Sequence, residues 1–109
     1  MTSNAVRSVI ALCDRLLQTE QFEHGAIIGY LQDFADPYAI PFLRDAVLMK
    51  PRLVYLDHDD YGSYYKKCFW ALKAIGTSGA IAVIQEFASS TDSIIRKESL
   101  YRLSKIARG

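Results

Sequence analysis

The chain has 109 residues, of which half are apolar and 23% are charged, so its composition is that of one soluble globular domain without a membrane-spanning segment. Its formal net charge is +1, but residues 1–60 hold nine acidic and five basic side chains, whereas residues 61–109 hold three acidic and eight basic ones. The short apolar run after Arg7 is interrupted at Asp14, so no signal peptide is expected, and two cysteines predicted to be reduced in the core favour a cytoplasmic protein. The uneven charge can steer a charged partner to one end, or simply keep two faces solvated.

The first two predicted helices are defined by their apolar faces. One runs over about residues 4–18 with Ser3 as its cap, and the next runs from a Thr19 cap to about residue 34. The second helix contains Gly25 and Gly29, each of which costs roughly 1 kcal/mol relative to alanine. Because they are four residues apart, they line one face, which indicates either close approach of a neighbouring helix or a backbone groove for a partner.

The third helix is predicted from Asp36 and Pro37, because aspartate caps free backbone amides and proline suits the first turn. Pro41 lies only four residues further, where a helix would lose a hydrogen bond or kink. An inserted loop follows over about residues 50–62, and Ser63 is the predicted cap of the fourth helix.

The last two helices begin at further capping residues. Gly76 ends the fourth helix, and Thr77 or Ser78 caps the fifth, which runs to about residue 88. Asp92 caps the sixth, over about residues 93–107. Its outer face is predicted to be basic, with Arg96, Lys97, Arg102, Lys105 and Arg108.

The predicted core is the set of apolar residues on the inner stripes of these helices. It comprises Val6, Val9, Ile10, Cys13, Leu16, Leu17, Ile27, Ile28, Leu31, Phe34, Ala39, Ile40, Leu43, Ala46, Val47, Tyr65, Cys68, Phe69, Leu72, Ala80, Ile81, Ile84, Phe87, Ala88, Ile95, Leu100, Leu103 and Ile106.

The helical pattern repeats along the chain. At an offset of 41 residues, segment 31–47 matches segment 72–88 in size, polarity or capping ability; at an offset of 31, Phe69 falls on Leu100. The two offsets differ by ten residues, which is about the extra length of the inserted loop. The chain therefore reads as a helical repeat of about 31 residues with one insertion.

A two-helix unit with Asp-Pro or Gly-Thr at its inner turn, followed by Ala-Ile and a Leu or Ile three residues on, resembles HEAT repeats. It resembles especially the short phycobilisome-lyase-like type, and the inner turns lie at Asp36 and at Gly76. The resemblance covers residues 25–106 and implies an all-α fold: a short HEAT-like α-solenoid of about six helices, in three stacked antiparallel pairs with one inserted loop, in a single domain 1–109. It also implies protein binding, and it carries no catalytic residues to this chain.

No pattern in the sequence supports catalysis or a metal site. Cys13 and Cys68 lie on the apolar sides of predicted helices, as reduced core cysteines do. His24 and His58 are too few for a metallohydrolase, and they lack the paired spacing of a zinc site with the cysteines. Residues 76–79 lack the lysine of a P-loop and are explained as an inner turn. We therefore expect no catalytic residue, no metal, no cofactor and no small-molecule substrate.

The acidic run in the insertion was also compared with a calcium loop. Asp57 and Asp59 would take the first and third positions, but Tyr61 and Cys68 would then stand where oxygen ligands are needed. Calcium binding is therefore not predicted.

Acidic and aromatic residues concentrate in and after the insertion, and we predict that they contact a partner. They are Tyr55, Asp57, His58, Asp59, Asp60, Tyr61, Tyr64 and Trp70. Long loops on a rigid scaffold often carry function, and tyrosine supplies contact area at little entropic cost. Alternatively, Leu53, Val54 and Leu56 cover a helix groove and the acids keep the loop soluble. Trp70 lies beside the inner stripe, so it is either half-buried packing or an exposed anchor.

These patterns predict a non-catalytic protein that binds another protein. A small helical protein with an acidic, tyrosine-rich loop is similar to the immunity proteins of bacterial toxin systems, which implies that the loop covers the basic active site of a toxin such as a nuclease. The alternatives are an adaptor, an enzyme-maturation scaffold, or an enzyme or nucleic-acid binder that uses the basic last helix. The acidic half of the chain would repel phosphates and argues against nucleic acid.

Overall fold

The computed structural model describes residues 2–18, 20–21, 23–49 and 61–108. Its elements are α1 (Thr2–Leu16), α2 (His24–Phe34), the 3₁₀ turn η1 (Pro37–Ala39), α3 (Ile40–Leu48), α4 (Tyr61–Ile75), α5 (Ser78–Phe87) and α6 (Ser93–Arg108). These ranges contain six α-helices and no strand, which confirms the predicted all-α class. None of these helices combines the length and apolarity needed to cross a bilayer.

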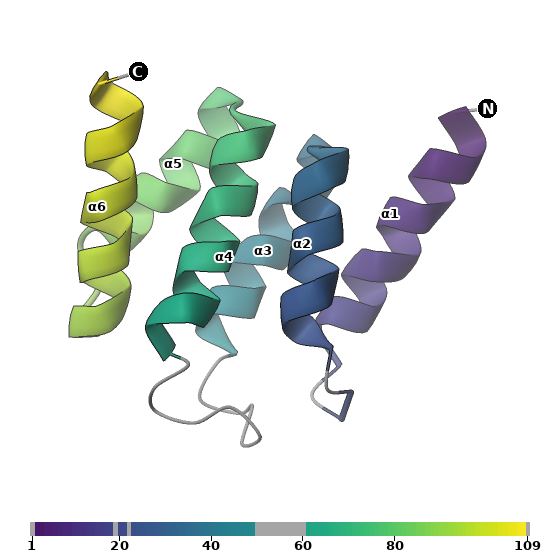
Figure 1. Ribbon diagram of the computed structural model, residues 1–109, viewed down its shortest axis with the longest axis horizontal. Coiled ribbons are helices and arrows are strands. Elements are labelled where there is room, and N and C mark those ends of the chain that lie inside the picture. The colour runs from purple at the N-terminus through teal and green to yellow at the C-terminus, as the bar shows by residue number, and fades with distance from the viewer. Residues whose placement is uncertain (1, 19, 22, 50–60, 109) are drawn as a thin grey trace.

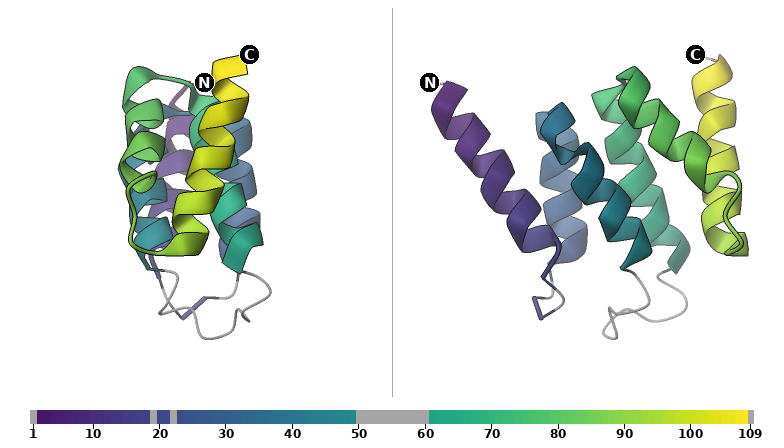
Figure 2. Two further views of the ribbon diagram at one scale, coloured as in Figure 1. Left: turned by 90° about the vertical axis from the view of Figure 1, so that its left-hand side faces the viewer. Right: turned by 180° about the vertical axis from the view of Figure 1, so that it is seen from behind.

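The helices pack in two layers. In one layer α2, α4 and α6 lie side by side and run in the same direction, and in the other α1, α3 and α5 run in the opposite direction (Figure 1, and from behind in Figure 2). The extents of 40 × 34 × 16 Å describe a slab two helices thick. Helix α4 is central, because it packs against α2 and α6 in its own layer and against α3 and α5 in the other.

Both predicted inner turns form by the expected local chemistry. The side chain of Asp36 accepts a hydrogen bond from the backbone N–H of Tyr38 at 2.9 Å. Gly76 adopts a positive φ of 70°, which glycine tolerates and which ends α4. Thr77 then caps α5, since its hydroxyl accepts from the N–H of Ala80 at 3.2 Å.

The chain accommodates Pro41 by opening the third helical segment with a 3₁₀ turn. Because η1 occupies Pro37–Ala39 and α3 begins at Ile40, Pro41 falls in the first turn of the α-helix. Backbone N–H groups there have no intrahelical acceptor, so the lost bond or kink expected at this proline does not arise.

The connection between α1 and α2 is longer than predicted. Helix α2 begins at His24, so Thr19, which lies outside the described residues, is not its cap. The side-chain amide of Gln21 donates to the carbonyl of Arg15 at 3.2 Å, and its oxygen accepts from the N–H of Glu23 at 2.5 Å. These bonds hold a non-helical turn up to Glu23, which delays the helix.

Two other helix starts also differ from the prediction. Helix α1 begins at Thr2, so Ser3 lies inside it, and α4 begins at Tyr61, two residues before the expected Ser63 cap. The insertion therefore ends at residue 60, and its residues 50–60 lie outside the described part of the chain.

Most of the predicted core is buried. Ile10, Phe34 and Leu100 are exposed instead; α1 and α6 are the outer helices of the slab, and Phe34 is the last residue of α2. The predicted positions that are buried are Val9, Cys13, Leu16, Ile27, Ile28, Leu31, Ala39, Leu43, Ala46, Val47, Tyr65, Cys68, Phe69, Leu72, Ala80, Ile84, Phe87 and Ile95.

Helix α6 turns a different face inward from the one predicted. Leu100 is 51% exposed, whereas Ser99 and Arg102 are buried, and the Ser99 hydroxyl donates to the Ile84 carbonyl at 2.5 Å. Because α6 lies at the edge of its layer, the position that Phe69 fills in the central helix α4 is left exposed in α6. Arg102 therefore does not belong to the basic outer face.

Candidate interaction surface

The predicted contact loop lies outside the described residues, and its role stays a prediction. This holds for Tyr55, Asp57, His58, Asp59 and Asp60. Tyr61 is the first residue of α4.

Tyr64 was predicted to contact a partner, but it belongs to the core. Its side chain is 4% exposed, and its hydroxyl donates to the Ala46 carbonyl at 2.7 Å. Ala46 lies in the last turn of α3, where carbonyls need hydrogen-bond donors from outside the helix. Tyr64 thus joins α4 to the end of α3, and we do not retain it in the contact surface.

Trp70 is partly exposed, and its role as an anchor for a partner stays a prediction. Its side chain is 39% exposed on α4, and its ring faces the Arg102 guanidinium, with the central carbon 4.0 Å from the ring centroid, and the Lys73 ammonium at 4.8 Å. The Tyr101 ring faces the same Arg102 at 5.4 Å and Lys105 at 5.3 Å. We call these five side chains, in which cations and rings alternate, the cation–aromatic cluster.

Two neighbouring helices place the two rings of this cluster at corresponding positions, each four residues after a lysine that lies outside the cluster. Lys66 and Trp70 on α4 correspond to Lys97 and Tyr101 on α6 at the 31-residue offset. In each helix the lysine and the aromatic residue are four apart and so share a face, and α4 and α6 lie side by side. This correspondence is the sequence signal from which the cluster could have been found.

Arg102 is the buried member of the cluster. It is 4% exposed, and its Nε has no hydrogen-bond partner among the described residues. Stacking on aromatic faces stabilises a desolvated cation by about 2 kcal/mol. Among the described residues the ion pairs are Arg15–Glu23, Arg44–Asp45 and Arg44–Glu86, so no cation of the cluster is paired with a carboxylate there.

Two hollows adjoin the cluster, and lysines line both. One, of about 250 Å³, lies between α4 and α6, and the other, of about 370 Å³, lies where α4 ends and α5 begins beside α6. The first is lined by Lys66, Lys97, Glu98 and Tyr101. The second is lined by Lys73, Gly76, Ile81, Lys105 and Ile106. Both hollows therefore favour anionic groups.

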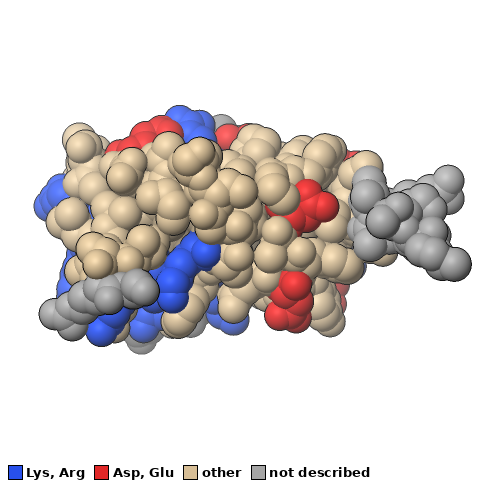
Figure 3. Space-filling view, turned by 90° about the horizontal axis from the view of Figure 1, so that it is seen from above, with Lys and Arg blue, Asp and Glu red and all other residues tan. Residues whose placement is uncertain are grey.

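The acidic and basic residues, which are unevenly distributed along the sequence, are also separated in space. In the lower half of Figure 3, Lys and Arg lie towards the α6 end of the slab, and Asp and Glu lie towards the α1 end. The exposed cations of α4 and α6 include Lys66, Lys97 and Lys105, whereas Asp33 is exposed on α2. The basic surface is thus confined to two helices.

A third hollow lies on α2, at one of the two glycines. A Cβ added to Gly29 would meet no atom within 4 Å, and one added to Gly25 would lie 3.7 Å from Lys67 Nζ, the flexible end of a side chain. The interpretation as close helix approach is therefore wrong for Gly29, which opens onto a groove of about 350 Å³. The lining residues are Ala26, Gly29, Tyr30, Gln32 and Asp33.

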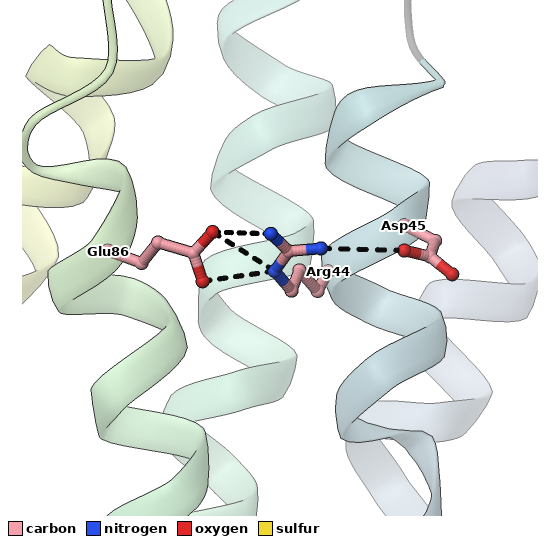
Figure 4. Close-up of polar contacts among 3 residues, drawn as sticks. All are labelled: Arg44, Asp45 and Glu86. Carbon is pink, nitrogen blue, oxygen red and sulfur yellow. Dashed lines mark hydrogen bonds and ion pairs between the residues drawn. The ribbon is translucent and has the colours of Figure 1, made fainter.

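On the other layer, Arg44 links α3 to α5 (Figure 4). Its Nε donates to both carboxylate oxygens of Glu86 at 3.0 and 3.1 Å, and its Nη2 donates to Oε2 at 2.5 Å. These bonds hold the pKa of Glu86 below its ordinary value. Asp45 lies 3.8 Å from the same guanidinium, so this arginine has carboxylate partners on both sides and acts as a structural link.

Burial favours the neutral forms of the two cysteines and of His24. Cys13 and Cys68 are free and buried; burial raises the pKa of Cys13 to about 11 and also raises the pKa of Cys68. His24 is buried, and burial lowers its pKa. Within the described ranges, no three His, Cys, Asp or Glu side chains group as metal ligands would.

Comparison with known proteins identifies no relative, because no family model, no curated protein and no solved structure matches the chain.

Proposed function

We propose that the chain is a short HEAT-like α-solenoid that works without catalysis by binding another protein. Its successive helices alternate between two layers, which is what stacked antiparallel pairs produce. The repeat of about 31 residues supports the same architecture.

The observation that carries the binding role is the outer face of α2, α4 and α6. These parallel helices expose large aromatic side chains: Tyr30 at 56% and Phe34 at 43% on α2, Trp70 at 39% on α4, and Tyr101 at 48% on α6. Tyrosine and tryptophan are enriched at protein interfaces, where they bury much area at little entropic cost. Tyr30 and Tyr101 each line a hollow, and Lys73, which faces the Trp70 ring, lines another, so the face offers both projections and recesses to a partner.

For the partner we propose a protein with a basic site, such as a bacterial toxin domain that the chain neutralises as an immunity protein. The acidic residues 57–60 directly precede α4 in the sequence. Trp70 follows Tyr61 by nine residues, about 14 Å along the helix. One interface of ordinary size, about 800 Å² on each side, can therefore include both the loop and Trp70.

Site-specific photo-crosslinking tests this function in cells that naturally produce the protein. Benzoylphenylalanine is placed at Tyr55 in the loop, at Trp70, or at Tyr38, an exposed aromatic residue of η1 that serves as the matched control. We expect the same protein adduct from the first two positions and no such adduct from the control. Adducts removed by nuclease would show a nucleic-acid partner, and no protein adduct from either test position would contradict the proposal.

Charge substitutions then test the role of the loop with the captured partner. Changing Asp57, Asp59 and Asp60 together to asparagine is expected to slow association and weaken its salt dependence, because these charges would steer a basic partner. Neutralising three exposed acids elsewhere removes the same charge and serves as the control, with Asp14 and Asp45 changed to asparagine and Glu20 to glutamine. Equal effects of both triple variants would mean that the loop has no specific role.

A further inference from the structure

We propose that the cation–aromatic cluster between α4 and α6 is a second binding site, which takes an acidic segment of a protein partner. The inference rests on the proposed function, because it assumes that the chain binds a protein. It adds a surface whose charge is opposite to that of the predicted acidic loop.

The positive charge of the cluster favours an acidic ligand. The cluster holds three cations, Lys73, Arg102 and Lys105, and none of them is in an ion pair within the described part of the chain. Glu98 is the one acid among the described residues that line the two adjoining hollows. Arg102 is almost fully buried between the rings, so salt and solvent screen its charge less than that of a surface lysine. The site therefore keeps a positive potential that a carboxylate can meet.

The aromatic faces of the cluster are already covered by cations, which favours a protein ligand over a nucleic acid. Single-stranded nucleic acids gain much of their affinity by stacking bases on free aromatic faces. Here cations already lie over the rings, with Arg102 over both Trp70 and Tyr101. A longer polyphosphate would also leave the basic surface at α2, which contains no lysine or arginine and exposes Asp33.

The same face also carries an apolar side chain. Ile94, Lys97, Tyr101 and Lys105 follow one another at three- and four-residue spacing, so they form one stripe on α6, and Ile94 is exposed. An exposed isoleucine beside lysines fits a ligand that has both apolar side chains and carboxylates. The stripe spans twelve residues, about 16 Å, so the ligand would be about three turns of an acidic amphipathic helix.

The position of the site also constrains a partner that uses the loop. Lys73 follows Tyr61 by twelve residues, about 18 Å along α4. A single partner that engaged both surfaces would therefore present a basic region and an acidic region about that distance apart.

The test uses the intrinsic fluorescence of Trp70, because the sequence contains 1 tryptophan and that residue lies in the proposed site. The full chain is titrated with a 15-residue helical peptide that has one face of Glu and one face of Leu. It is also titrated with the same peptide carrying Gln in place of Glu, and with a thymidine oligonucleotide of about the same charge as the acidic peptide. We expect the acidic peptide to change the emission and to bind about 10-fold tighter than the Gln peptide.

The double variant Lys73→Gln, Lys105→Gln is expected to bind the acidic peptide about 10-fold more weakly. The control Arg15→Gln with Arg96→Gln removes the same charge away from the cluster and should change affinity less than about 2-fold, with circular dichroism confirming that both variants are folded.

Three results would each overturn the inference: an equal loss of acidic-peptide affinity in the two double variants, tighter binding of the oligonucleotide than of the acidic peptide, or no change of Trp70 emission with the acidic peptide. The crosslinking test of the proposed function would stand in all three cases, because it assumes nothing about the charge of the partner.

Discussion

Replacing Gly29 by alanine is expected to stabilise the protein. Glycine inside a helix costs about 1 kcal/mol relative to alanine, chiefly through backbone entropy of the unfolded chain. The added methyl group would meet no atom within 4 Å, so no steric cost opposes this gain. For a chain of 109 residues, an unfolding entropy of about 2.1 cal/mol/K per residue converts 1 kcal/mol into a rise in Tm of about 4 °C.

Thermal unfolding followed by far-UV circular dichroism measures this shift, and two other glycines calibrate it. Gly25→Ala should also raise Tm, since its methyl group would contact only the flexible end of Lys67 at 3.7 Å. Gly76→Ala should lower Tm, because φ is 70° there and an L side chain strains that conformation by about 1 kcal/mol.

A lower Tm for Gly29→Ala, together with a higher one for Gly25→Ala, would refute the reasoning. It would show that another part of the chain packs closely on Gly29, so that the hollow on α2 is filled. A higher Tm accompanied by weaker partner binding would instead show that a partner occupies the hollow.

Tyr64→Phe should destabilise the protein by about 1 kcal/mol in urea unfolding, because the Ala46 carbonyl loses its hydroxyl donor; an unchanged midpoint would mean that this bond contributes nothing. Burial lowers the pKa of His24, so the unfolded chain binds a proton that the folded one does not, and stability should fall as pH drops below the ordinary value of 6.5. His24→Gln should remove part of that slope, and an unaltered slope would exclude this histidine as its source. Burial raises the pKa of both cysteines, to about 11 for Cys13, so the unfolded chain loses these protons first and stability should fall as pH rises above 9.0. At neutral pH a thiol reagent should label Cys13 and Cys68 slowly in the folded protein and quickly in denaturant, and fast labelling in both states would show exposure.

The helix starts that the sequence predicted correctly are those set by local hydrogen bonds. Asp36, Thr77 and Asp92 each cap the following turn with their own side chains, and such bonds involve residues two or three positions away. Thr19 failed as a predicted cap because the turn before α2 is held by Gln21, whose bonds reach back to the carbonyl of Arg15. No spacing rule for helix caps contains that contact.

The candidate site was harder to predict than the helices, because it depends on how helices pack. Leu100 was expected inside and Arg102 outside, since the apolar period of α6 was read as if both sides of the helix were covered. In the slab α6 has neighbours on one side, so Arg102 turns towards Trp70 on α4. The correspondence of Trp70 with Tyr101 at the 31-residue offset was present in the sequence, but only the side-by-side placement of α4 and α6 gives it a chemical meaning.

The central position of α4 sets how much order the proposed site must gain on binding. Helix α4 packs against α2 and α6 in its own layer and against α3 and α5 in the other. Its backbone amide hydrogens should therefore exchange with solvent mainly through global unfolding, while α1 and α6 fray more easily. We therefore expect Trp70 and Lys73 to stand on the slowest-exchanging of the described helices, and Arg102 ties α6 to it. A ligand that docks there meets side chains already fixed in place, so the conformational entropy lost on association is small, and mutations that loosen α4 should weaken binding even where they touch no ligand.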